Sequence, residues 1–73
     1  MATKNSKRTA KPSYYAVQID DVGSRRVAAG HRTARSVAQH IASLATWINV
    51  DEFASSWNAA APDGGERFEI GQE

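Results

Sequence analysis

Apolar and polar residues alternate over residues 13–20, which predicts a half-buried β-strand. One side of this strand carries Tyr15, Val17 and Ile19, and the other carries Tyr14, Ala16, Gln18 and Asp20. Residues 20–24 supply turn chemistry, with Gly23 free to adopt a positive φ. Residues 25–29 predict a return strand with Val27 and Ala29 pointing inward. The pattern therefore predicts a β-hairpin over residues 13–30, with Tyr14 on its exposed face.

A helical pattern follows the hairpin. Thr33 can cap a helix, and apolar residues then recur at helical spacing within an arc of about 120°. They are Ala34, Val37, Ala38, Ile41, Leu44, Ala45 and Ile48. The spacing predicts an amphipathic helix over residues 33–48 whose apolar stripe covers the inward face of the hairpin.

A second, shorter helix is predicted after residue 48. Asn49 and Glu52 have the spacing of a capping box, and Phe53 and Trp57 follow at helical spacing, so Trp57 is expected in the core. The alanines at 59–61 could extend this helix as far as Pro62. The competing interpretation makes residues 53–60 a strand, joined by the turn at residues 62–65 to a second hairpin.

A last strand is predicted over residues 66–71, with Phe68 and Ile70 on one face. The predicted order is strand, strand, helix, short helix, strand. This pattern indicates an α+β fold with a small antiparallel sheet covered on one face by the amphipathic helix. Residues 13–71 are expected to form a single compact domain. Residues 1–12 are polar, basic and without periodicity, and are predicted to be a disordered tail.

The composition limits the chemistry that this domain can support. The 73 residues include no cysteine and only two histidines, which excludes disulfides, thiolate metal sites and a histidine-based structural zinc site. We therefore expect no metal and no cofactor. No apolar run approaches the roughly 20 residues of a membrane helix, and no secretory signal is recognisable. These observations favour a cytoplasmic protein that does not bind membranes and is a monomer.

The charges are sorted along the chain. Residues 1–35 hold eight of the nine Lys and Arg residues and two carboxylates, whereas residues 36–73 hold Arg67 and six carboxylates. The formal net charge of +1 thus hides a dipolar molecule, whose partners are steered by electrostatics. The carboxylates occur at predicted turns and helix starts, where capping and solvation explain them. A domain of this size also has little room for a catalytic cleft, so no enzyme is expected.

Four arginines gather around the predicted hairpin and the start of the helix: Arg25, Arg26, Arg32 and Arg35. Together with the nearby Tyr14 they have the composition of a single-stranded nucleic-acid platform, or alternatively of an ordinary solvated face. The hairpin-then-helix order resembles the second half of a double-stranded-RNA-binding domain and the arm-binding domain of tyrosine recombinases. The Lys-Lys-x-Ala-Lys run of the former is absent. His31 is interpreted as a solvated loop residue, with an anion site as the alternative, and His40 as a surface residue.

Trp47 falls outside the apolar stripe of the predicted helix, about 60° beyond its edge. It either packs under the second helix or offers an anchor to a partner, as interface hot spots do. Combined with the charge polarity, the second possibility favours a protein-binding module.

The whole chain resembles small phage-encoded antitermination factors in size and organisation: a basic tail, a hairpin over residues 14–29, a helix over residues 33–48 and an acidic end. That resemblance implies binding to host RNA polymerase through its large subunits, inhibition of transcription initiation and read-through of terminators. The resemblance identifies no contact residue. From the arginine cluster and the aromatic residues near it, the expected partner-binding residues are Tyr14, Arg25, Arg26, Arg32, Arg35 and Trp47. The alternatives are a nucleic-acid-binding module and a phage anti-defence inhibitor of the anti-CRISPR type.

Overall fold

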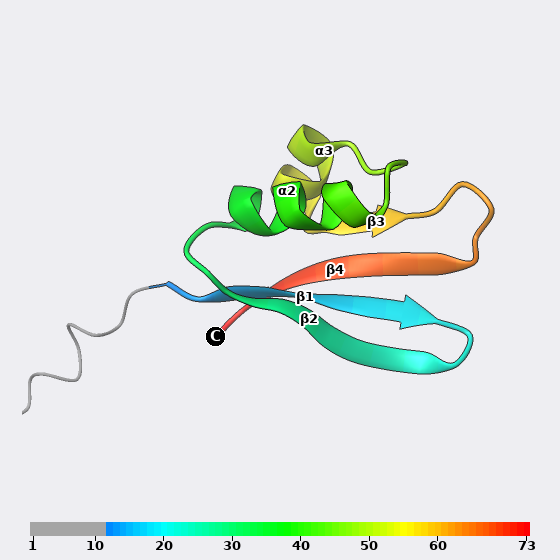
Figure 1. Cartoon of the computed structure of the whole chain (residues 1–73), viewed down its shortest axis with the longest axis horizontal. Coiled ribbons are helices and arrows are strands. Elements are labelled where there is room, and N and C mark those ends of the chain that lie inside the picture. Colours follow the sequence, from blue (N-terminus) through cyan, green and yellow to red (C-terminus); the bar gives the residue numbers. More distant parts are fainter. Residues whose placement is uncertain (1–11) are drawn as a thin grey trace, which may run out of the picture.

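The computed structural model describes residues 12–73, and the predicted tail lies outside these residues except for Pro12. The elements in chain order are β1 (Tyr14–Asp20), β2 (Gly23–His31), α2 (Ala34–Leu44), α3 (Val50–Ser56), β3 (Asn58–Ala60) and β4 (Glu66–Gln72). The four strands form one antiparallel sheet in the order β2-β1-β4-β3. Both helices lie on one face of this sheet (Figure 1). The predicted α+β fold is confirmed, and β3 is an additional strand.

The hairpin of β1 and β2 is confirmed. Asp20 closes its turn, because its Oδ1 accepts hydrogen bonds from the backbone N–H groups of Val22 and Gly23. The pairing shifts between Tyr14 and Ala16, and Ala28 takes a φ of 53° inside this bulge. The bulge carries β2 on to His31, beyond the predicted end. It also leaves Ala29 exposed, so the inward placement predicted for Ala29 is wrong.

The predicted facing of β1 is inverted. The helices cover the side of Ala16, which is fully buried, and Tyr14 packs against the same core. Tyr15, Val17 and Ile19 therefore point to the face that neither helix covers. The reason lies in β4, where Ile70 pairs with Ala16 and Phe68 pairs with Gln18. Burying these two large side chains places α2 above Ala16, whose small side chain allows the helix to approach the sheet closely.

The first helix is shorter than predicted. Thr33 is its N-cap, with Oγ1 accepting a hydrogen bond from the Ser36 N–H at 3.0 Å. The helix ends at Leu44 rather than at residue 48, because Ala45 adopts an extended conformation. Leu44, expected in the stripe, is 72% exposed. The early end lets the chain turn so that Trp47 packs on Phe68, with ring centroids 6.0 Å apart.

The sequence left open whether the segment after residue 50 is a helix or a strand. Residues 50–60 contain both, the helix α3 and the strand β3. Asn49 caps α3 by accepting a hydrogen bond from the Glu52 N–H at 3.0 Å. The helix stops at Ser56, so the predicted extension through the alanines is wrong. Trp57 takes the left-handed conformation with φ 63°, and β3 follows and pairs with β4. The turn at residues 62–65 therefore closes a second hairpin.

The core lies between α2, α3 and the helix-covered face of the sheet. Its residues are Ala16, Val37, Ala38, Ile41, Ala45, Ile48, Phe53, Phe68 and Ile70. Ile41, Val37 and Phe53 are its largest fully buried side chains. Trp57 is not among them, because 37% of its surface is exposed, which corrects its predicted place in the core.

Candidate interaction surface

The sheet presents one face to the helices and leaves the other uncovered within the part of the chain that the structure describes (Figure 1). The register of the strands defines the side chains on this uncovered face. We call the open face the surface formed by Tyr15, Val17, Ile19, Arg26, Arg67 and Glu69. Val17 lies between Arg26 of β2 and Glu69 of β4, while Ile19 lies next to Arg67 of β4.

Tyr15 is held in place from both neighbouring strands. Arg26 reaches across from β2, and its guanidinium carbon lies 3.7 Å from the centroid of the Tyr15 ring. On the other side, Gly71 of β4 leaves the room that the tip of the ring occupies. A guanidinium over an aromatic face is attracted by the ring quadrupole. The ring is thus a pre-positioned feature of the open face.

Arg26 is fixed by a second contact. Its Nη1 donates to Oε2 of Glu73 at 2.5 Å, and both side chains are about half exposed, at 52% each. The backbone N–H of Glu73 donates to the Ser13 carbonyl at 2.9 Å, which ties the end of the chain to the start of β1. Arg67 and Glu69 form a further ion pair on the same face. At such exposure these pairs add little stability, but they neutralise the charges around the apolar residues.

The open face therefore has an apolar row along β1 with paired charges on both flanks. Tyr15, Val17 and Ile19 are only half-buried by their neighbours. In an antiparallel sheet with one solvated face, that face normally carries polar side chains. An apolar centre with aromatic and arginine residues inside a polar rim is instead the anatomy of protein–protein interfaces. Such a surface can bind another protein, whereas its balanced charges give a polyanion no net attraction.

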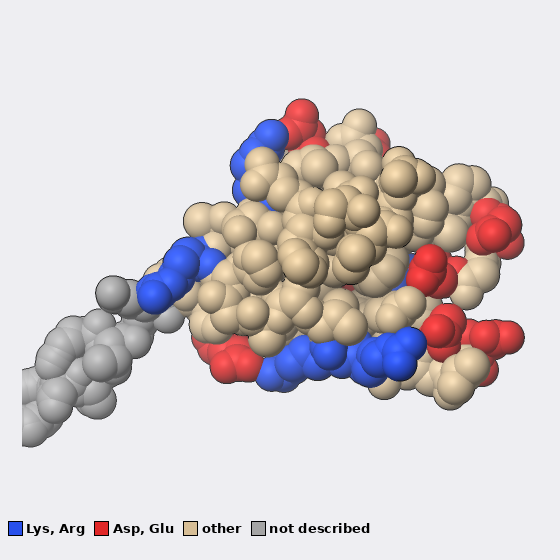
Figure 2. Space-filling model, viewed as in Figure 1, with Lys and Arg blue, Asp and Glu red and all other residues tan. Residues whose placement is uncertain are grey.

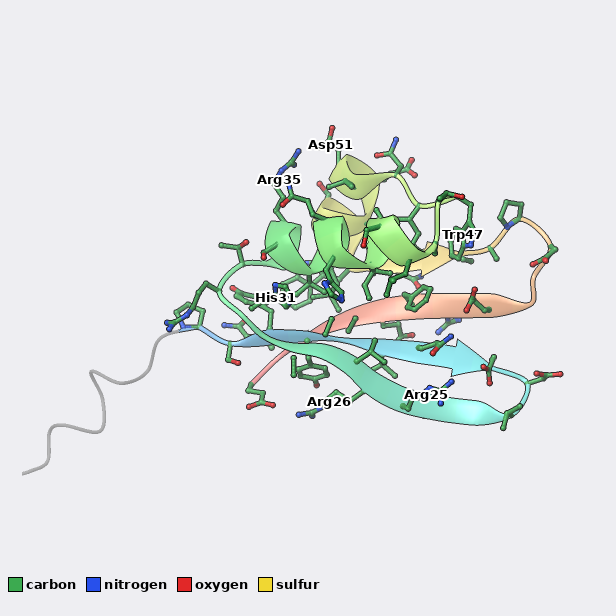
Figure 3. All side chains as sticks on the ribbon, in the orientation of Figure 1. Arg25, Arg26, His31, Arg35, Trp47 and Asp51 are labelled. Carbon is green, nitrogen blue, oxygen red and sulfur yellow. The ribbon has the colours of Figure 1, made fainter. Side chains whose placement is uncertain are left out.

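The six residues expected from the sequence do not form one patch. Figure 3 labels four of them and shows Arg26 on the sheet, Arg35 on the helices and Trp47 at the end of the domain away from Arg35. Arg26 belongs to the open face, but Arg25 pairs with Gln18 in register and donates to its Oε1 on the helix-covered side. Arg35 bridges the two helices through an ion pair with Asp51 at 2.7 Å. Arg32 is exposed in the turn between β2 and α2.

The two remaining residues lie on the helix-covered side. Tyr14 packs edge-on against Trp57, with ring centroids 5.9 Å apart. Trp47 is half-buried against Phe68, and it lines an open hollow together with residues of the two turns at that end of the sheet. The carboxylates of this hollow are Asp20, Asp21, Asp63 and Glu66. Tyr14 thus lies on the helix-covered face and Tyr15 on the open face, the reverse of the predicted facing.

The sequence pattern did not predict that Tyr15, Val17 and Ile19 lie on an accessible surface. Their alternation was visible, but the facing of the strand is decided by β4, far away in the sequence. The exposure of Trp57 was missed as well. A glycine is usual at the left-handed position that ends a helix, so a tryptophan there carries no recognisable signal.

Comparisons with protein-family models, with curated proteins and with solved structures find no match to this chain. Over residues 12–73, neither helix combines the length and the apolar character needed to cross a membrane. The same residues contain no group of three or more His, Cys, Asp or Glu side chains arranged to hold a metal ion. The function is therefore inferred from the fold and from the side chains on its surface.

Proposed function

We propose that this chain is a small regulatory protein that acts by binding another protein through the open face, without chemistry of its own. The observation that carries the proposal is the apolar row of Tyr15, Val17 and Ile19 on an uncovered sheet face, flanked by the ion pairs of Arg26 with Glu73 and Arg67 with Glu69. Host RNA polymerase is the partner implied by the resemblance to phage antitermination factors. Binding would inhibit initiation and promote read-through of terminators.

The geometry of the open face supports protein binding in preference to nucleic-acid binding at this surface. Both of its arginines are paired with glutamates, so phosphate groups would have to displace them. The Tyr15 ring already has Arg26 over it, so a base could stack there only after Arg26 moves. A protein partner would bury the apolar row and keep the paired charges at the rim, where they set orientation rather than affinity.

The test is a pair of substitutions that changes the apolar row and preserves the strand. Val17→Thr with Ile19→Thr keeps β-branching, which strands favour, but replaces apolar surface with hydroxyl groups. Leu44→Thr is the matched control, because Leu44 is a highly exposed apolar residue on the opposite side of the molecule. Purified RNA polymerase is immobilised, and the affinity of each variant is measured by surface plasmon resonance.

We expect the double variant to bind at least about tenfold more weakly, since each lost apolar contact at an interface centre is worth on the order of 1 kcal/mol or more. Leu44→Thr should bind like the unmodified chain. Equal affinities for all three proteins would rule out the open face as the binding surface. If the unmodified chain fails to bind polymerase, a pull-down from nuclease-treated lysate with the same three proteins decides whether another protein requires the open face. Capture of no protein would refute the proposed function.

A further inference from the structure

The open face carries a cation and a carboxylate on opposite sides of its apolar row, at the same level along the strands. Arg26 of β2 and Glu69 of β4 are both in register with Val17, so they flank the middle of the row. In Figure 2 basic atoms follow β2 along the lower border of the molecule, with acidic atoms at both ends of them. A surface with a cation on one flank and an anion on the other can complement a second copy of itself.

A two-fold axis that runs along β1 brings the unlike flanks of two copies together. Rotation about this axis turns the second copy over, keeps each residue of β1 at its level and places β2 of one copy over β4 of the other. Arg26 of each copy then faces Glu69 of the other, and the two apolar rows meet. Sheets that pack face to face with nearly aligned strands have this geometry, and closed two-fold pairs are the commonest assemblies of identical chains.

The ion pairs already present on each copy stay intact in this arrangement. Arg26 is bonded to Glu73, and Arg67 is bonded to Glu69. The contact between Arg26 and Glu69 of the second copy joins these pairs into a series of alternating charges on each flank. Exposed pairs contribute little singly, whereas several charges in a network contribute more. The two flanks therefore become charge networks that enclose the apolar rows.

The other two-fold orientation fits the charges less well. An axis across the strands at Val17 sets Arg26 over Arg26 and Glu69 over Glu69, and opposed like charges are costly. Moving this axis by one residue pairs Glu69 with Arg67, but it places Tyr15 beyond the end of the facing row and leaves Arg26 without a carboxylate opposite. Of these arrangements, only the axis along β1 pairs both flanks and covers all three apolar residues.

From this self-complementarity we propose that the chain forms a reversible homodimer through the open face, with its two-fold axis along β1. A second copy covers the surface that binds the protein partner, so the dimer and the complex exclude each other. In this respect the inference rests on the proposed function and adds a regulation to it. Dimerisation stores the chain with its apolar row covered, and a partner that binds more tightly releases it.

The size of the open face sets the strength of the dimer. The sheet is four strands wide and its two inner strands have seven residues each, which gives a face of about 19 Å by 23 Å, or about 450 Å² in projection. A stable interface covers roughly 800 Å² on each partner. We therefore expect a dissociation constant between about 10 μM and about 1 mM. The monomer that the composition favours is then the main form in dilute solution.

The test is analytical ultracentrifugation of the full chain at 50 mM salt, from about 10 μM to about 1 mM protein. The average molar mass should rise with concentration toward that of two copies. Arg26→Glu and Glu69→Arg each oppose like charges on both flanks of a homodimer, so each variant should self-associate at least about tenfold more weakly. An equimolar mixture of the two variants has opposite charges on both flanks. It should associate at least about tenfold more tightly than either variant alone.

Arg25→Glu is the matched control, because it makes the same charge change on the same strand but on the helix-covered side. It should dimerise like the unmodified chain. Val17→Thr with Ile19→Thr is a second disruption that leaves the charges unchanged, and it should stay a monomer. Circular dichroism confirms that each variant is folded.

A monomer over the whole concentration range would overturn the proposal. So would equal association of the unmodified chain and both charge variants, or a mixture that associates no better than its components. These measurements contain no polymerase, so the two proposals fail separately. A chain that binds polymerase but never dimerises refutes the dimer alone, whereas a dimer that captures no protein partner refutes the proposed function alone.

Discussion

The ring of Tyr15 fills the space that a side chain on Gly71 would need, directly across the antiparallel pair of β1 and β4. A glycine inside a strand lacks side-chain packing, and an aromatic residue on the neighbouring strand can cover it. The ring is also contacted by Arg26 from the other neighbouring strand. Three strands thus set the position of one half-buried aromatic residue on the open face, which is what a rigid anchor at an interface requires.

Gly71→Ala should disturb this arrangement, because the new methyl group would clash with the tip of the Tyr15 ring. We expect a loss of about 1–3 kcal/mol in the free energy of unfolding, the usual cost of overpacking. In a Tyr15→Ala background the same substitution should cost much less, since the ring is gone. Urea unfolding of the two single variants and the double variant measures this coupling. Additive effects would show that the two residues do not depend on one another.

Ile41→Asp is expected to abolish cooperative unfolding. Ile41 is fully buried in the centre of the core, and a carboxylate there has no partner to compensate its desolvation. That cost is comparable with the whole stability of a small domain. Gln39→Asp, on the exposed side of the same helix, is the matched control and should retain a sharp transition. Thermal melts followed by circular dichroism decide the matter, and an unchanged transition for Ile41→Asp would contradict the observed packing.

Ala28→Gly should stabilise the hairpin. Ala28 has a φ of 53°, which costs an alanine about 1–2 kcal/mol and a glycine almost nothing. Glycine loses part of this gain through its greater freedom in the unfolded chain, so the net effect should be about 0.5–1 kcal/mol. Ala29→Gly is the control, because Ala29 has a negative φ and should lose stability instead. Chemical denaturation gives both values, and two effects of the same sign would argue against the bulge.

Local signals in the sequence were sufficient for most of the element types and several boundaries, but not for β3. Thr33 and Asn49 were predicted as helix caps, and each accepts a hydrogen bond from the backbone N–H three residues later. Phe68 and Ile70 were predicted on one face of the last strand, and both are buried. Helix caps and the alternation of a strand depend only on residues close together in the chain, so they can be recognised in a single sequence.

Long-range relationships were beyond local patterns. Both faces of β1 carry apolar residues, and the choice between them depends on the register with β4, about 50 residues later. No local pattern marked the early end of α2 either, which lets Trp47 pack on Phe68. The predicted binding site is the part that differs most from the structure, because it groups arginines that the fold separates. Arg26 lies on the open face, whereas Arg35 pairs with Asp51 between the helices.

Deletion of residues 1–11 tests the predicted role of the basic segment. It carries four cations and no apolar periodicity, so the sequence predicts that it takes no part in the core. The melting temperature of the truncated chain should therefore equal that of the full chain. Association with polymerase should slow at low salt and change little at high salt, because salt screens long-range steering. The open face should still provide specific binding in reduced form. A lower melting temperature, or complete loss of polymerase binding on truncation, would show instead that the segment is a structural or binding element.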